Sequence, residues 1–320
     1  MLTPESVIWA YRVLLGRDPE SQEVIREKVA ACANLGVLRD SLMASQEYME
    51  AQSIQGAKTE VIFEDEDGDR FVLDLNDHAI GRQIMAGRYE PAVLNCVRKL
   101  VQKGRLCIDV GANIGYYSIK MGRMGAKVLA LEPVSYLCER LSKAVRENEA
   151  LDRLTFPVGT GGVVHYRQFA AGAEDGEMVM IHAPATINQG GAYLMPAGTQ
   201  APPNHVAETV TVTRLDKFMR TWPDLFDHGV RLIKMDVEGA EPLVVLGGWE
   251  LIKKYKPAIV AEIHRQQYAK VSETTPEEFV GRLRQLGYRA FFLHGENEVV
   301  EFSPTDRLPD YDNILLVADR

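Results

Sequence analysis

The sequence predicts an α/β fold whose main domain is a doubly wound, largely parallel sheet, preceded by a small all-helical segment. From residue 106 onward, continuous apolar runs alternate with segments of helical periodicity, which is typical of a parallel sheet covered by helices on both faces. A glycine-containing loop, "IDVGANIGYYS" at residues 108–118, follows the first run and opens a predicted helix. A sheet of this kind binds its ligand across the carboxyl ends of its strands.

Residues 1–55 are predicted to be a helical module of three short helices. Thr3 is expected to be the N-cap of the first helix, and apolar residues follow it at helical spacing. The segment "GRDPES" separates the first two helices, and the third follows "NLG" and is expected to extend to about Tyr48.

Residues 56–105 are predicted to form a β-hairpin and a helical lead-in to the main domain. In "EVIFEDEDGDRFVLDL", two alternating runs surround an Asp-Gly pair, which is a strong hairpin signal. One or two helices are expected in the segment "HAIGRQIMAGRYEPAVLNCVRKLV" that follows.

Residues 106–320 are predicted to be the third domain, in which most strands are followed by a helix. The last two strands have no helix between them, which predicts an antiparallel pair at the end of the sheet. Residues 151–217 contain Gly/Pro-rich loops among short strands, and long loops are often binding loops or lids; an exposed insertion is the alternative. The predicted strands are residues 106–110, 127–133, 232–237, 258–264, 288–294 and 313–319.

The composition restricts the partners. The formal net charge is −9 and no Lys/Arg-rich run occurs, which argues against a nucleic-acid partner because phosphate neutralisation needs a basic face. We expect a cytoplasmic protein without a membrane span, since the sequence has neither an apolar run of roughly 18 residues nor the basic region and cleavage site of a signal peptide. The four cysteines lie far apart, so no zinc site or disulfide is predicted, and no metal site is assigned.

The glycine loop lacks the G-x-G-x-x-G pattern of dinucleotide-binding folds, since Asn113 stands where a middle glycine would be. Gly111 and Gly115 follow Asp109, an acid at the strand tip that suits an ammonium group better than a phosphate. Glu132 ends the second strand, where a carboxylate can accept hydrogen bonds from both ribose hydroxyls. These residues predict S-adenosylmethionine, a cationic and unphosphorylated nucleoside, as the ligand.

Several motifs, in order along residues 76–319, resemble those of the FkbM-type methyltransferase family. The resemblance implies a class I fold with a seven-stranded sheet whose last strand is antiparallel, S-adenosylmethionine as methyl donor, and O-methylation of a sugar or polyketide-type hydroxyl. The stretches "FPVGTGGVVHYRQ" and "PAGTQAPPNHVAE" depart from the family pattern and leave the acceptor open. The motifs are "IDVGANIGYYS", "LEP" (131–133), "FAAGAEDGE" (169–177), "TRLDKF" (213–218), "LIKMDVEGAEPLVVLGG" (232–248) and "PAIVAEIH" (257–264).

The resemblance also implies a set of donor-binding residues. The glycine loop would line the methionine end of the donor, Glu132 its ribose, and the region of Ala171 its adenine. Glu90, in the family-like element "RYEP", would approach the amino group of the donor; the alternative is that it only starts the helix at Pro91. The implied cofactor-binding residues are Glu90, Asp109, Gly111, Ala112, Asn113, Gly115, Glu132 and Ala171.

Acidic side chains are predicted on the acceptor side. An alcohol is a weak nucleophile, so its methylation needs a base that removes the proton while the oxygen is held in line. Asp236 and Glu238 lie on one side of the fourth strand tip, and Glu262 and His264 form a similar pair on the fifth. The predicted catalytic residues are Asp236, Glu238 and His264, with Asp236 or His264 as the base. The acids could instead bind sugar hydroxyls or a divalent cation. A further alternative is that Glu238 and Glu241 have no role beyond capping the helix.

The helical module resembles the DUF4214-type domain of bacteria through "AYRVLLGRDPES" and "LRDSLMASQEYM". The resemblance implies an association with surface-glycan or secreted-polymer pathways, with self-association or contact with a pathway protein through these helices. A generic helical cap on the main domain is the alternative.

The predicted function is S-adenosylmethionine-dependent O-methylation of a hydroxyl on a sugar, a glycoconjugate or a related natural product. The acceptor is thus expected to be a small molecule or a glycan. The competing predictions are an NAD-dependent oxidoreductase on a related sheet and a non-catalytic protein that binds S-adenosylmethionine or a glycan.

Overall fold

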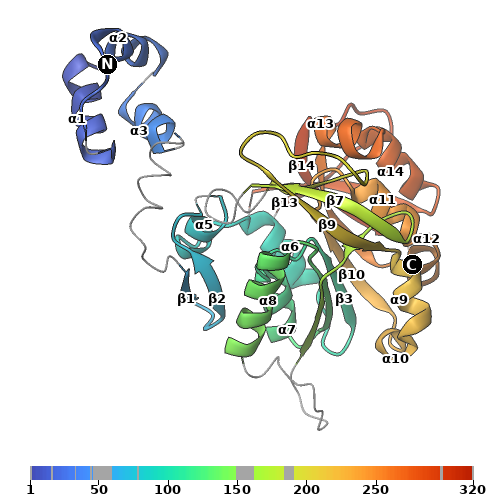
Figure 1. Cartoon of the computed structure of the whole chain (residues 1–320). Helices are drawn as coiled ribbons and strands as arrows, with labels where there is room; N and C mark the ends of the chain where they lie inside the picture. The colour runs from blue at the N-terminus through green and yellow to red at the C-terminus, as the bar shows by residue number, and fades with distance from the viewer. Residues whose placement is uncertain are drawn as a thin grey trace. The chain divides into compact units, whose positions relative to one another are not determined.

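The chain divides into two compact units, Met1–Thr59 and Glu60–Arg320 (Figure 1). Each unit has buried hydrophobic residues of its own. Among the described residues, no helix is both long and apolar enough to cross a membrane. The computed structural model describes residues 2–15, 17–32, 34–43, 45, 60–77, 79–148, 162–183, 191–295 and 298–318.

The first unit consists, in its described part, of the three expected helices, which are α1 (Pro4–Leu15), α2 (Gln22–Ala31) and α3 (Leu35–Met43). Ser21 caps α2, since its side chain accepts a hydrogen bond from the backbone N–H of Val24. Tyr48, which we expected at the end of the third helix, lies outside the described residues. Buried side chains of all three helices form the core: Val7, Ala10, Tyr11, Ile25, Leu38 and Leu42.

The second unit begins with the expected antiparallel hairpin, β1 (Glu60–Glu64) and β2 (Arg70–Asp74). Helix α8 (Ser135–Glu147) packs against this hairpin. Arg140 of α8 joins the two strands, because its guanidinium bonds to Glu60 at 2.8 Å and to Asp74 at 3.1 Å. The lead-in continues with α5 (Gly81–Met85) and α6 (Pro91–Leu100).

The main sheet has eight strands among the described residues, in the order β13-β12-β14-β11-β10-β3-β4-β5. Five neighbouring strands of this sheet, β11, β10, β3, β4 and β5, are parallel to one another. Strand β14 is antiparallel to both of its neighbours, β11 and β12. The strands are β3 (Leu106–Val110), β4 (Lys127–Leu131), β5 (Val163–Arg167), β10 (Val230–Met235), β11 (Ala258–His264), β12 (Tyr288–His294), β13 (Glu298–Glu301) and β14 (Tyr311–Ala318).

The seven-stranded sheet expected from the sequence is therefore extended by one edge strand, β13. The sequence did not reveal this strand because all four of its residues, "EVVE", are exposed. A strand without a buried face carries neither a continuous apolar run nor an inward-facing alternation.

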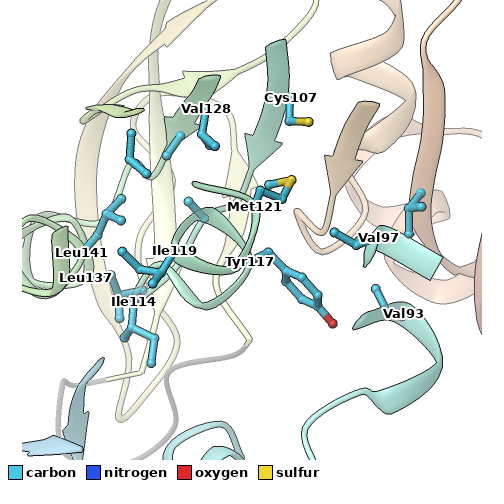
Figure 2. Packing of buried hydrophobic residues seen from close by; sticks show 14 of the residues in the cluster. Val93, Val97, Cys107, Ile114, Tyr117, Ile119, Met121, Val128, Leu137 and Leu141 are labelled. Atoms are coloured by element: carbon cyan, nitrogen blue, oxygen red, sulfur yellow. The ribbon is translucent and has the colours of Figure 1, made fainter. Parts of the chain in front are cut away.

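Helices cover both faces of the main sheet. Neighbouring residues of one strand belong to different buried clusters: Val128 of β4 packs in one cluster, and Leu129 packs in the other. In the first cluster, Leu137 and Leu141 of α8 lie beside Ile114 and Ile119 (Figure 2). The covering helices are α7 (Tyr116–Arg123), α9 (Leu215–Thr221), α10 (Pro223–Phe226), α11 (Glu241–Gly247), α12 (Trp249–Tyr255), α13 (Arg265–Gln267), the π-helix η1 (Tyr268–Ser272) and α14 (Pro276–Arg284), together with α6 and α8.

The loosely patterned region between β5 and α9 contains a second, smaller sheet. Its order is β6-β9-β7-β8, and the long strands β7 and β9 lie antiparallel, side by side (Figure 1). Residues 151–161 and 184–190 of this region lie outside the described residues. The strands are β6 (Ala170–Ala171), β7 (Gly176–His182), β8 (Tyr193–Met195) and β9 (Val206–Thr213).

Candidate active site

The loop between β3 and α7 has two glycines with a left-handed backbone, and at Gly111 the closeness of another backbone requires glycine. Gly111 has φ +78°, and a Cβ there would lie 2.0 Å from the carbonyl oxygen of Asp236. Gly115 has φ +93°, and a Cβ there would lie 2.5 Å from Cδ1 of Leu141. The glycines therefore let the loop approach the tip of β10 on one side and α8 on the other.

Glu132, at the end of β4, binds this loop through a buried carboxylate. Its Oε2 accepts a hydrogen bond of 2.8 Å from the backbone N–H of Asn113, and its Oε1 accepts one of 2.8 Å from Val134. Burial raises the pKa of Glu132 to about 7, although these two bonds favour the charged form. The carboxylate is thus fixed at the strand tip, with the remaining lone pairs of its oxygens available to a ligand.

A first cavity of about 510 Å³ opens beside Glu132. Most of its wall is apolar, with residues from β4, α8 and the second sheet, and its polar groups belong to Glu132, the glycine loop and the tip of β10. The lining residues are Val110, Gly111, Asn113, Leu131, Glu132, Pro133, Val134, Leu137, Phe169, Ala170, Ala171, Met180, Ala192, Leu194, Asp236, Val237 and Glu238.

A second cavity of about 1010 Å³ shares Gly111, Asn113, Asp236 and Glu238 with the first. Its wall is polar, because four carboxylates and four tyrosines line it. The lining residues are Ala79, Ile80, Gln83, Arg88, Tyr89, Glu90, Gly111, Ala112, Asn113, Ile114, Tyr116, Tyr117, Lys234, Asp236, Glu238, Glu262 and Tyr311.

Three of these carboxylates, Asp236, Glu238 and Glu262, form a cluster at the tips of β10 and β11. One oxygen of each lies within 4.8 Å of an oxygen of the others. Burial, and next the charge of Asp236, raise the pKa of Glu262 to about 9 and that of Glu238 to about 7. At neutral pH, Glu262 therefore holds a proton and Glu238 titrates.

Lys234 supplies a positive charge beneath the cluster. Its Nζ donates a hydrogen bond of 3.1 Å to Oδ2 of Asp236 and lies 4.8 Å from the centre of the Tyr117 ring. Burial alone would lower the pKa of Lys234, but the charges of Asp236, Asp109 and Glu90 raise it above its usual value. The buried ammonium therefore stays charged and partly neutralises the carboxylates around it.

Glu90 faces the second cavity and does not cap α6. Its backbone is left-handed, with φ +41°, and its side chain makes no capping hydrogen bond to the helix. The carboxylate instead accepts hydrogen bonds from the Tyr117 hydroxyl at 2.8 Å and from Asn313 Nδ2 at 3.3 Å. Burial raises the pKa of Glu90, and the charge of Asp236 raises it further.

Asp109, Gly115 and His264, three of the residues predicted from the sequence, line neither cavity. Asp109 is fully buried and accepts a hydrogen bond of 2.6 Å from Ser118 Oγ; within the described part of the chain its Oδ1 has no partner. His264 caps α13, since its Nδ1 accepts a hydrogen bond from the backbone N–H of Gln267. The other predicted site residues all line one cavity or both.

Glu241 has the structural role that the sequence allowed for it. Its fully buried carboxylate accepts hydrogen bonds from the backbone N–H groups of Val237 at 2.8 Å and Gly239 at 3.1 Å. It thus fixes the loop that carries Glu238, which has a left-handed backbone with φ +50°.

Three tyrosines of the site were missed: Tyr89, Tyr117 and Tyr311. Glu262 was named from its alternation with His264 at the end of a buried strand, but it was not assigned a catalytic role. The tyrosines come from separate elements, and no spacing in the sequence brings them together. The hydroxyl of Tyr311 bonds to Glu262, so the tyrosines belong to the same polar network as the carboxylates.

The two cavities fit the two ends of S-adenosylmethionine. The apolar wall of the first suits an adenine ring, and Glu132 at its edge suits a ribose diol. The carboxylates where the cavities meet suit the positively charged sulfonium and amino groups.

The sequence matches the model of one protein family over more than half of its length. The sequence model of the methyltransferase FkbM domain matches residues 109–290. A crystal structure of methyltransferase FkbM from Methylobacillus flagellatus is 15% identical with a TM-score of 0.42, and the match covers 97% of this chain and 58% of that one. The chain thus spans little more than half the length of that protein.

Two further solved structures are similar to this chain. TYW2 of M. jannaschii in complex with AdoMet is 10% identical with a TM-score of 0.38, over 82% of this chain and 85% of that one. The tRNA (uracil-54, C5)-methyltransferase of Pyrococcus abyssi, in complex with S-adenosyl-L-homocysteine, is 13% identical with a TM-score of 0.39, over 81% and 44%. No curated protein matches the sequence. Because residues 109–290 make up more than half of its 320 residues, the chain belongs to the FkbM methyltransferase family, whose methyl donor is S-adenosylmethionine.

Proposed function

We propose that this protein is an O-methyltransferase that acts on a hydroxyl group of a sugar, a glycoconjugate or a related natural product. The observation that carries the proposal is the meeting of the two cavities at Gly111, Asn113, Asp236 and Glu238. At this junction, the first cavity, an apolar nucleoside site with a carboxylate at its edge, adjoins the second. The second cavity is a polar site rich in carboxylates and tyrosines. A methyl group at the junction would face an acceptor in the second cavity.

On the donor side, Glu132 accepts hydrogen bonds from the ribose hydroxyls, and Ala171 and its apolar neighbours enclose the adenine. Gly111, Ala112 and Asn113 border the methionine end, where Glu90 faces the amino group. Asp109 and Gly115 act from behind the cavity wall: Asp109 anchors α7 through Ser118, and Gly115 lets the loop pack on α8.

On the acceptor side, Asp236 is the base that we propose. The bound donor supplies an electrophilic methyl group on a sulfonium. Lys234 holds Oδ2 of Asp236, while the side chain remains 26% exposed and lines both cavities, so its other oxygen can accept the proton of an acceptor hydroxyl.

Glu238 and Glu262 orient the other hydroxyls of the acceptor. A carboxyl group that holds a proton donates one hydrogen bond and accepts others, as a polyhydroxylated ligand requires. His264, the alternative base predicted from the sequence, lines neither cavity and is left out of the proposed mechanism.

The proposal is tested with labelled S-adenosylmethionine and surface-glycan fractions of the source cells. The full chain should label a glycan fraction, and Asp236→Asn should lower the transfer rate by at least ~10²-fold, the contribution of a general base. Calorimetry should show that Asp236→Asn still binds S-adenosylhomocysteine, so that the loss of rate is not a loss of donor binding. Asp227→Asn, an exposed aspartate outside both cavities, is the matched control. Unchanged transfer in Asp236→Asn would exclude this base, and donor binding without transfer to any hydroxyl compound would favour a non-catalytic protein.

A further inference from the structure

A third cavity, of about 870 Å³, adjoins the second. Tyr89 and Tyr116 line both, so the two cavities share this pair of rings. Open solvent makes up part of these volumes, and the space that a ligand can enter is about 350 Å³ in the second cavity and about 330 Å³ in the third. Sites for drug-sized ligands measure roughly 300–1,000 Å³, so each cavity alone has the capacity for a small ligand of this kind. The polar surface next to the donor site therefore extends beyond what one sugar unit needs.

The part of the wall that the two cavities share is aromatic. The rings of Tyr89 and Tyr116 meet edge to face, with their centres 5.1 Å apart, and Tyr116 makes the same kind of contact with Tyr117 at 5.3 Å. Such packing fixes the orientation of the rings. A tyrosine offers an apolar face for the C–H groups of a sugar and a hydroxyl that forms hydrogen bonds.

The remaining wall of the third cavity includes fixed, charged groups. The guanidinium of Arg98 on α6 bonds to Asp67 at 2.7 Å. The buried ammonium of Lys120 lies 2.6 Å from Asp65, 2.6 Å from Asp67 and 2.9 Å from Asp69, all in the turn of the β1–β2 hairpin. Lys120 thus occupies the centre of these three carboxylates, where a cation would otherwise bind.

We propose that the third cavity binds a second sugar unit of the acceptor, so that the substrate is an oligosaccharide or a glycan chain and not a single sugar. The proposal rests on the proposed function, since it places the reacting unit in the second cavity. Carboxylate and guanidinium groups form paired hydrogen bonds with neighbouring hydroxyls, and the shared tyrosines border both units. The aromatic pair then marks the position of the glycosidic linkage.

Arg98→Ala tests the binding of a second sugar unit in the third cavity and leaves the proposed catalytic carboxylates unchanged. An exposed ion pair contributes only about 0–1 kcal/mol, so the variant should fold. The matched control is Arg289→Ala, which removes an equally exposed arginine paired with Glu301 on β12 and β13, away from all three cavities. Melting temperatures and S-adenosylhomocysteine affinities of both variants should equal those of the unaltered chain.

The acceptor is surveyed with an array of immobilised mono-, di- and trisaccharides in the presence of S-adenosylhomocysteine, followed by titration of the sugars that bind. The unaltered chain should bind a disaccharide at least about tenfold more tightly than the matching monosaccharide. Arg98→Ala should weaken the binding of the disaccharide about tenfold, which is the effect of losing one hydrogen bond to a charged group. The affinity for the monosaccharide should stay unchanged. Arg289→Ala should change neither.

The outcomes separate this proposal from the proposed function. The proposed site for a second sugar unit is wrong if monosaccharides bind and longer sugars bind no more tightly. It is also wrong if Arg98→Ala weakens the binding of the monosaccharide and the disaccharide to the same extent, or weakens the binding of neither. In each of these cases the acceptor site in the second cavity stands. If S-adenosylhomocysteine binds but no sugar of any length binds, the acceptor is not a sugar. The proposed site for a second sugar unit is then wrong as well.

Discussion

At the scale of a single residue, the proposed donor site depends on Glu132. Its carboxylate is buried, yet both of its oxygens accept backbone hydrogen bonds, one of them from the glycine loop. The group thus orders the loop and faces the first cavity. Its raised pKa, about 7, means that the free protein is only partly ionised at neutral pH. Because ribose hydroxyls are donors to the ionised form, binding of a nucleoside is coupled to loss of a proton.

Adenosine, which lacks the cationic methionine end, isolates this coupling. Its affinity should be constant well above pH 7 and fall by up to about tenfold for each pH unit below it, because the proton on Glu132 must then be released for binding. Glu132→Gln should bind adenosine about tenfold or more weakly and without this pH dependence, since one hydrogen bond to a charged group is lost. Calorimetry between pH 5.5 and pH 8.5, a range of about three units around that pKa, measures both effects.

Glu139→Gln is the control for this experiment, because Glu139 lies exposed on α8 and pairs only with Lys143 among the contacts described. It should keep the affinity and the pH dependence of the unaltered chain. Equal affinity for adenosine in Glu132→Gln and the unaltered chain would mean that Glu132 only holds the loop.

At the scale of elements, the site depends on how closely β3 and β10 approach each other at their carboxyl ends. Gly111 and Gly104 have nearly the same backbone, with φ +78° and +76°, but different surroundings. A Cβ at Gly111 would meet the carbonyl oxygen of Asp236, whereas a Cβ at Gly104 would have nothing within 4 Å. The pair therefore separates backbone strain from steric conflict.

Gly104→Ala should lower the free energy of unfolding by about 1–2 kcal/mol, the cost of a left-handed backbone with a Cβ. Gly111→Ala should lower it by roughly twice as much, since it adds overpacking, and should abolish binding of S-adenosylhomocysteine because Asp236 and the loop must move apart. Denaturation curves and calorimetry check both variants. Equal effects of the two substitutions would show that the approach of the loop to β10 has no role in binding.

The elements themselves could be predicted wherever one face is buried. The strands β3, β4, β10 and β11 carry continuous apolar runs, and their order along the chain indicates a parallel sheet. The edge strand β13 has no buried residue, and it escaped prediction for that reason. The sequence showed the short strands of the second sheet but not that they pair with one another, because pairing over long distances leaves no local pattern.

The site could be predicted to the same extent. Glu132 and the glycine loop are adjacent to strands that the sequence reveals, so their meeting follows from the parallel order. Tyr89, Tyr117 and Tyr311 come from a loop, a helix and the antiparallel strand, and only the folded chain brings them to the second cavity. His264 has the alternation of a strand-tip residue, but the chain turns into α13 directly after it, and its ring caps that helix.

At the scale of the whole molecule, the second unit, Glu60–Arg320, contains all the residues that the proposed function requires, and we call it the catalytic unit. Among the described residues, those that line the cavities all belong to Glu60–Arg320, and both large buried clusters lie in this unit. The helical unit has a separate cluster formed by its own three helices. The lead-in from β1 to α6 belongs structurally to the catalytic unit, since the hairpin packs against α8 and Glu90 lines the second cavity.

A chain that begins at Glu60 should therefore fold by itself and bind S-adenosylhomocysteine within about twofold of the affinity of the full chain. A twofold change corresponds to about 0.4 kcal/mol, less than the loss of one hydrogen bond. Thermal unfolding followed by circular dichroism and calorimetric titration measure the two properties. Sedimentation velocity of both chains also tests the self-association that the N-terminal helices suggested, which should be confined to the full chain. A shorter chain that fails to fold, or that loses donor binding, would mean that the catalytic unit depends on the helical one.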